Sequence, residues 1–180
     1  PAWRLDIGAQ GLELIADDGA SRAFASGPLV VEAEGLRSYQ ATSAGGELEA
    51  LVFDRVCVDT MSGMTHPNTV EVRWQERVLR GCGGDPALLL QGEPWEVVEL
   101  DGRAVADPAR ITLGFAAEGR LAGSAACNRY CGSYVLSGEG LRLSPLGATK
   151  MACESRAMEE ERRFMVAAAT VSGFAIATDG

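Results

Sequence analysis

Apolar and polar residues alternate in several short stretches of the chain. Val70, Val72 and Trp74 are separated by charged residues, which is the period of a strand that buries one face. The same tendency appears at residues 95–100, 111–115 and 141–143. Glycine-containing turn signals such as Gly45-Gly46 lie between these stretches. The pattern predicts short antiparallel strands joined by tight turns.

One segment near the end of the chain has a helical period instead. Its apolar residues form a single helical stripe and comprise Ala157, Met158, Phe164, Met165, Ala168 and Val171. The pattern predicts one helix from Ser155, as N-cap, to about Val171, with Met158, Phe164, Met165 and Ala168 buried. The acidic run Glu159-Glu160-Glu161 is expected to be a solvated helix face. Gly173 is expected to stop the helix before a strand at Phe174–Thr178.

A domain boundary is predicted at Gly83-Gly84-Asp85-Pro86, where flexible glycines meet a proline that blocks strand continuation. The boundary gives two domains, residues 1–86 and 87–180. We expect a mainly β fold that is α+β in its second half. It consists of two small antiparallel β domains, the second with one helix packed on its sheet.

The chain is acidic, with a formal net charge of −9. Seven arginines against thirteen acidic residues precede Pro86, a net of −6, and nine basic against twelve acidic residues follow it, a net of −3. A nucleic-acid backbone needs a basic surface, so no nucleic-acid partner is expected. No run approaches the about eighteen apolar residues of a transmembrane helix. The sequence begins without a signal-peptide pattern, as a mature or trimmed form would.

The five cysteines predict disulfides in an oxidising compartment. The paired spacing of a structural zinc site is missing, and His66 is the only histidine. Domains with small hydrophobic cores gain stability from disulfides. The alternative is that the cysteines are buried free thiols of a cytosolic protein. Cys57 and Cys82 end neighbouring strand-like segments on either side of one loop, and Cys127 ends a strand while Cys153 precedes the helix. We therefore expect the pairs Cys57–Cys82 and Cys127–Cys153, with Cys131 free or, alternatively, joined to Cys153.

Candidate catalytic residues are scarce. Ser62 lies four positions from His66, and Asp59 could complete a hydrolase site, but triads gather distant parts of a chain and need an oxyanion hole. A cysteine nucleophile would have only His66 as its base. We therefore expect no enzyme, no cofactor and no metal site. Asn128 is interpreted as a turn residue that tolerates left-handed backbone.

A binding surface is predicted in the loop between Cys57 and Cys82. Two methionines and a proline near a turn offer apolar contact at a low ordering cost when a disulfide holds the loop. We expect this loop to be solvent-exposed and to bind an unknown protein partner. Its residues are Met61, Ser62, Gly63, Met64, His66 and Pro67.

The second half resembles the META domain family, which includes HslJ. The motifs that carry the resemblance are Cys127-Asn128-Arg129-Tyr130, Gly132-Ser133-Tyr134 and Thr149-Lys150-Met151-Ala152-Cys153, followed by the helix. The resemblance covers about residues 87–178. Ala126 stands where the family has Gly, which suggests a slightly different turn. The family carries further strands after the position of Phe174–Thr178, so closing strands are expected beyond Gly180 or the sheet closes differently.

The first half is similar to an uncharacterised family of envelope lipoproteins, through Cys57-Val58-Asp59-Thr60-Met61-Ser62-Gly63-Met64 and Gly81-Cys82-Gly83. Together the resemblances imply a non-catalytic binding or structural protein of the bacterial periplasm or outer membrane. They imply a link to heat shock, stress response or envelope integrity, and membrane attachment only through an upstream lipid anchor. The alternatives are an inhibitor of a secreted enzyme such as lysozyme and, more distantly, a Ser62–His66 hydrolase.

Overall fold

The computed structural model describes residues 3–16, 19, 21–107 and 110–177. The chain divides into two compact units. Unit 1 spans Pro1–Asp85 and Ile176–Gly180, and unit 2 spans Pro86–Ala175. Each unit has a hydrophobic core of its own, so the two are described separately.

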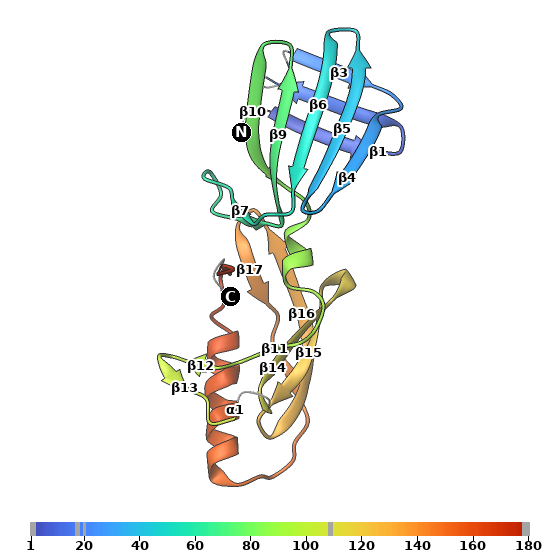
Figure 1. Cartoon of the computed structure of the whole chain (residues 1–180). Helices are drawn as coiled ribbons and strands as arrows, with labels where there is room; N and C mark the ends of the chain where they lie inside the picture. The colour runs from blue at the N-terminus through green and yellow to red at the C-terminus, as the bar shows by residue number, and fades with distance from the viewer. Residues whose placement is uncertain (1–2, 17–18, 20, 108–109, 178–180) are drawn as a thin grey trace. The chain divides into compact units, whose positions relative to one another are not determined.

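Unit 1 consists of two antiparallel sheets with a core between them. The first sheet has the order β1-β2-β3, with strands β1 (Trp3–Gly8), β2 (Gly11–Ala16) and β3 (Ser21–Ala25). The second has the order β10-β9-β6-β5-β4, with strands β4 (Leu29–Ala33), β5 (Leu36–Ser43), β6 (Gly46–Phe53), β9 (Asn68–Trp74) and β10 (Arg77–Gly83). The strands of the first sheet cross behind those of the second (Figure 1). A short pair, β7 (Cys57–Val58) and β8 (Thr65–His66), follows β6.

The alternation in the sequence sets which face of the second sheet is buried. Val70, Val72 and Trp74 of β9 are buried, and Val72 pairs in register with the buried Ala50 of β6. Because side chains alternate between faces, the residues between them project to the opposite face. There Glu71 forms ion pairs with neighbouring arginines. The predicted alternation at residues 70–74 is therefore confirmed.

Unit 2 is a curled antiparallel sheet with one helix packed on it. The sheet contains β11 (Trp95–Glu96), β14 (Thr112–Ala116), β15 (Arg120–Ala125), β16 (Asn128–Ser137) and β17 (Gly140–Leu143), while β18 (Gly147–Ala148) also pairs with β16. The unit also contains a pair of short strands, β12 (Glu99–Leu100) and β13 (Arg103–Ala104), the 3-10 turns η2 (Pro86–Leu89) and η4 (Ala117–Gly119), and helix α1 (Ser155–Ala168). Figure 1 shows α1 alongside the strands of this unit. The predicted mainly β, antiparallel fold with one helix is confirmed.

Two predicted strands differ from the structure. Residues 95–100 form two short strands because the chain changes its hydrogen-bonding partner: Val97 N–H donates to Ile111, whereas the Val98 carbonyl accepts from Val105. Residues 174–177 form no strand, and residue 178 lies outside the described residues. Just before this segment, the Ser172 carbonyl accepts a hydrogen bond from the Leu141 N–H. Phe174 then packs its side chain on the core of unit 2.

The helix is confirmed, but its N-cap, its end and its buried face differ from the prediction. Helix α1 begins at Ser155 with Glu154 as its N-cap, and it ends at Ala168 rather than at about Val171. Ala157, Phe164 and Ala168 are buried, whereas the side chain of Met158 is 50% exposed. The predicted burial of Met158 is wrong because the buried stripe passes through Ala157, one position earlier, which leaves the Met158 side chain exposed. Among the described residues, no helix is long and apolar enough to cross a membrane.

Candidate functional site

The predicted binding loop of unit 1 is a hairpin held by a disulfide. Strand β7 pairs with β8, and Cys57 is bonded to Cys82 of β10, with a Cα–Cα distance of 5.4 Å. The structure thus contains the first of the two predicted disulfides. It joins the base of the hairpin to an edge strand of the second sheet.

Hydrogen bonds inside the loop fix its shape. The Asp59 carboxylate accepts hydrogen bonds from the Ser62 hydroxyl at 2.6 Å and from the Ser62 N–H at 3.0 Å. These bonds favour the ionised carboxylate and hold the pKa of Asp59 below its ordinary value. The Asp59 N–H donates to the Met64 carbonyl. The loop therefore closes on itself at Asp59.

The loop is exposed only at its tip. Met61 is 77% exposed, and Ser62 and Gly63 are also exposed. Met64 is buried, and His66 and Pro67 are half-buried. The expected exposure of the whole loop is therefore wrong from Met64 onward. The main-chain bond between Asp59 and Met64 folds this part of the loop inward.

Ser62 and His66 do not form the pair that a hydrolase needs. The Ser62 hydroxyl donates to Asp59, and His66 Nδ1 lies 3.1 Å from the carbonyl oxygen of Gly84. An activated serine requires its hydroxyl proton to face a base. Here the hydroxyl proton faces the Asp59 carboxylate, whose pKa is held below its ordinary value. The geometry gives the hydrolase alternative no support.

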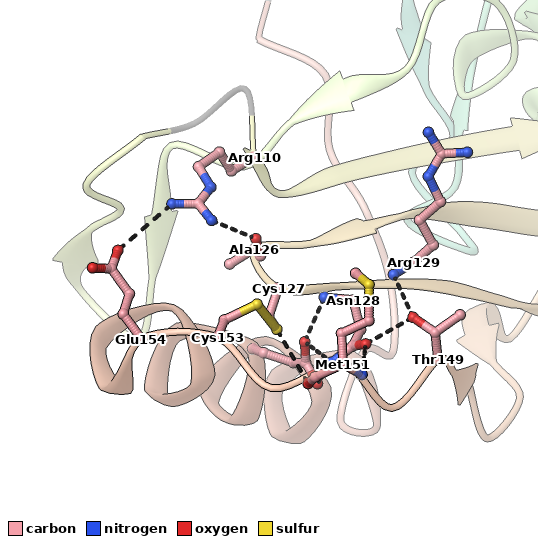
Figure 2. Close-up of a disulfide and its surroundings, with 10 residues drawn as sticks. Arg110, Ala126, Cys127, Asn128, Arg129, Thr149, Met151, Cys153 and Glu154 are labelled. Carbon is pink, nitrogen blue, oxygen red and sulfur yellow. Dashed lines mark hydrogen bonds and ion pairs between the residues drawn. A yellow bond between two sulfur atoms is a disulfide. The ribbon is translucent and has the colours of Figure 1, made fainter.

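The candidate site in unit 2 is built around the second predicted disulfide. Cys127, in the turn between β15 and β16, is bonded to Cys153, with a Cα–Cα distance of 5.9 Å (Figure 2). Beside it lie Asn128, Thr149, Met151 and Glu161, which we call the Asn128 cluster. The cluster joins the turn before β16 to the segment before α1 and to α1 itself.

Asn128 uses both ends of its side-chain amide in this cluster. Its Oδ1 atom accepts from the Thr149 hydroxyl and from the Met151 N–H, both at 2.7 Å. Its Nδ2 group donates to the two carboxylate oxygens of Glu161 at 3.1 and 3.0 Å. Its backbone N–H also donates to Glu161, at 2.8 Å. Asn128 is 4% exposed, so these bonds replace water at a buried polar group.

Glu161 is a site residue that the sequence analysis missed. It was expected in a solvated acidic face, but it lies half-buried against Asn128. The sequence did contain a signal: Ala157, Glu161, Phe164 and Ala168 follow each other at helical spacing, so Glu161 belongs to the buried stripe. A carboxylate on such a stripe requires a hydrogen-bonding partner. The prediction of a solvated face at residues 159–161 is therefore wrong for Glu161.

The left-handed residue of the turn is Ala126, with a φ of 70°, and not Asn128 as expected. Arg110 donates to the Ala126 carbonyl at 3.0 Å (Figure 2). Left-handed backbone costs a residue with a Cβ about 1–2 kcal/mol. Ala126 thus adopts the conformation that the Gly of the resembling motif would favour, and the turn is kept.

Two buried tyrosines of the same motifs, both on β16, bind strand β14, which lies beyond β15 in the sheet. The Tyr130 hydroxyl donates to the Thr112 carbonyl at 2.7 Å, and the Tyr134 hydroxyl donates to the Ala116 carbonyl at 3.1 Å. Gly123 leaves the space for this contact, because a Cβ there would lie 2.7 Å from the Tyr130 hydroxyl. Burial raises the pKa of Tyr130, so its phenol remains a hydrogen-bond donor.

The remaining sequence-predicted residue is Cys131, which is a free, exposed thiol on β16. Among the residues that the structure describes, no group of three or more His, Cys, Asp or Glu side chains is placed to hold a metal ion.

Comparison with known proteins identifies the second half of the chain. The model of the META domain matches residues 88–180. Neither the comparison with curated proteins nor the comparison with solved structures gives a match. The matched segment contains the Asn128 cluster, the Cys127–Cys153 disulfide and both tyrosines that bind β14. The chain therefore belongs to the META domain family.

Proposed function

We propose that this chain is a non-catalytic binding or structural protein of the bacterial cell envelope, in the periplasm or at the outer membrane. The observation that carries the proposal is the role of the META motifs. Their polar side chains bond to one another, to Glu161 and to β14. These bonds stabilise the fold. The motifs therefore support a rigid module better than a catalytic centre.

The disulfides support an oxidising compartment. Each unit contains one disulfide, and each joins segments that are distant in the sequence. Disulfides persist in the periplasm and are rare in the cytosol, where thiols are kept reduced. The similarity of the first half to envelope lipoproteins agrees with this compartment. Within the proposal, membrane attachment depends on an upstream lipid anchor, and the role belongs to stress response and envelope integrity.

Counting free thiols in the natural host tests the compartment. Protein from cells that are quenched with acid, denatured and treated with a maleimide polymer should carry one polymer chain, at Cys131. Reduction before labelling should raise this number to five. The variant Cys131→Ser should carry none without reduction. Five labels without prior reduction would mean that both disulfides are absent in the cell, which would overturn the proposal.

The second candidate is an inhibitor of a secreted enzyme such as lysozyme. It is supported by the exposed Met61 at the tip of a hairpin whose base is held by the Cys57–Cys82 disulfide. Such a loop loses little conformational entropy on binding.

The inhibitor candidate predicts that the full chain slows cell-wall hydrolysis by lysozyme. Met61→Asp should weaken this inhibition about tenfold, because it places a charge at the centre of the contact. Met61 is the methionine changed because it is exposed, whereas Met64 of the same loop is buried. Met158→Asp is the control, since Met158 is 50% exposed but lies in unit 2. Equal inhibition by the two variants, or none by the unaltered chain, would reject the candidate.

A further inference from the structure

Unit 1 contains a cleft of about 510 Å³ that the proposed function does not use. It lies between β1 and the face of the second sheet that carries the core, where β1 crosses that sheet (Figure 1). Val52 and Val70 lie at its base, and both are buried. The volume is within the range of clefts that hold small organic ligands, about 300–1,000 Å³.

One part of the cleft wall is apolar and incompletely covered, whereas the rest is polar. Trp3 and Leu5 of β1 and Tyr39 of β5 line it and are only half-buried against the core of unit 1. Ile7 also lines it and is 40% exposed. Gly81 allows Trp3 to lie flat against β10, because a Cβ at this position would be 2.9 Å from the indole ring. The apolar side chains therefore gather around a space and do not fill it.

The charged groups of the cleft are both arginines. Arg37 pairs in register with Val52, so its side chain projects from the same face of the sheet as the buried valine. Arg4 is the other arginine among the lining residues. Arg37 forms an ion pair with Asp54, and Arg4 forms one with Asp6. Neither carboxylate is among the described residues that line the cleft. This arrangement is notable in a half of the chain with a net charge of −6.

We propose that this cleft binds a small amphipathic anion. The apolar body of the ligand lies against Trp3, Leu5 and Val70, and its anionic head lies at Arg37. One Nη2 contact to Asp54, at 3.2 Å, occupies only part of the Arg37 guanidinium. A guanidinium has five donors in a fork that matches a carboxylate or a phosphate. The shared chemistry is therefore an acyl or aryl chain with either head group.

Titration of the full chain with ligands of equal chain length tests the proposal. The probes are decanoate, decyl phosphate, decan-1-ol and decylammonium, each below its micelle concentration and followed by calorimetry and amide NMR. The two anions should bind about tenfold more tightly than the alcohol, since they add a charge-assisted hydrogen bond. Decylammonium should bind most weakly. The ratio between carboxylate and phosphate distinguishes the two head groups.

Two variants locate the site. Arg37→Gln should weaken decanoate binding about tenfold and leave decan-1-ol binding unchanged. Arg22→Gln is the matched control, because Arg22 also forms an exposed ion pair on a strand of unit 1 but does not line the cleft. Ile7→Trp should fill the space and abolish binding of both ligands.

Equal binding of all four probes would overturn the proposal, as would equal effects of Arg37→Gln and Arg22→Gln. Amide shifts confined to unit 2 would overturn it as well. The cleft does not depend on the compartment of the protein. Failure of ligand binding would therefore leave the proposed envelope function unaffected, and the thiol count would leave the cleft unaffected.

Discussion

Replacing Phe164 by Ala should destabilise the protein by about 3–5 kcal/mol. Phe164 is 2% exposed and lies in the core of unit 2. Its ring centroid is 5.1 Å from that of Tyr130 on β16. The substitution removes this contact and leaves a cavity between helix and sheet, where rigid strands prevent collapse. Urea unfolding of the full chain, followed by circular dichroism, measures the loss.

Val166→Ala is the control for this experiment. Val166 lies on the same helix but is 56% exposed, so its truncation should change the free energy of unfolding by less than about 0.5 kcal/mol. Similar losses for the two variants would contradict the packing of α1 through Phe164.

Replacing Asn128 by Ala should destabilise unit 2 by about 3–5 kcal/mol. The substitution leaves the Met151 N–H without its 2.7 Å acceptor, a buried loss of about 1–3 kcal/mol. It also removes the Nδ2 bonds to the Glu161 carboxylate, and a hydrogen bond to a charged group contributes about 1.5–3 kcal/mol. Hydrogen exchange of the amides in β16 and α1 would report the loss in this unit directly.

A double-mutant cycle separates the Asn128–Glu161 contact from other effects. The losses from Asn128→Ala and Glu161→Ala should be non-additive by about 1–3 kcal/mol, because each variant alone removes the two side-chain bonds between Asn128 Nδ2 and Glu161. Glu159→Ala is the control, since the Glu159 side chain is 54% exposed and pairs with Arg162 instead. Additive losses would show that Glu161 does not stabilise the fold through Asn128.

Glu161 also shows why part of the candidate site could not be predicted. The helical period placed it with Ala157 and Phe164, but hydrophobicity alone favoured Met158. Burial depends on which elements cover a helix, and here β16 presents a buried amide that requires a carboxylate partner. That partner is 33 residues away in the sequence, beyond the range of any local pattern.

The binding loop and the cleft of unit 1 depend in the same way on contacts between distant segments. Met64 is buried because the loop closes on Asp59, which composition does not indicate. Trp3 and Arg37 are separated by more than thirty residues. They line one cleft only because β1 crosses the face of the second sheet on which Arg37 lies.

The sequence by itself determined the β-rich fold, the strand alternation at 70–74, a helix that begins near Ser155 and the Cys57–Cys82 pair, and it favoured Cys127–Cys153 over Cys131–Cys153. These features follow from periods of two or 3.6 residues and from cysteines that end neighbouring elements. The tertiary structure alone decided that Met158 is exposed while Glu161 faces Asn128, which polar groups meet in the Asn128 cluster, and where the core of unit 1 stays open. Those outcomes depend on how sheets and helix pack, because burial and hydrogen bonding are set by neighbours in space and not along the chain.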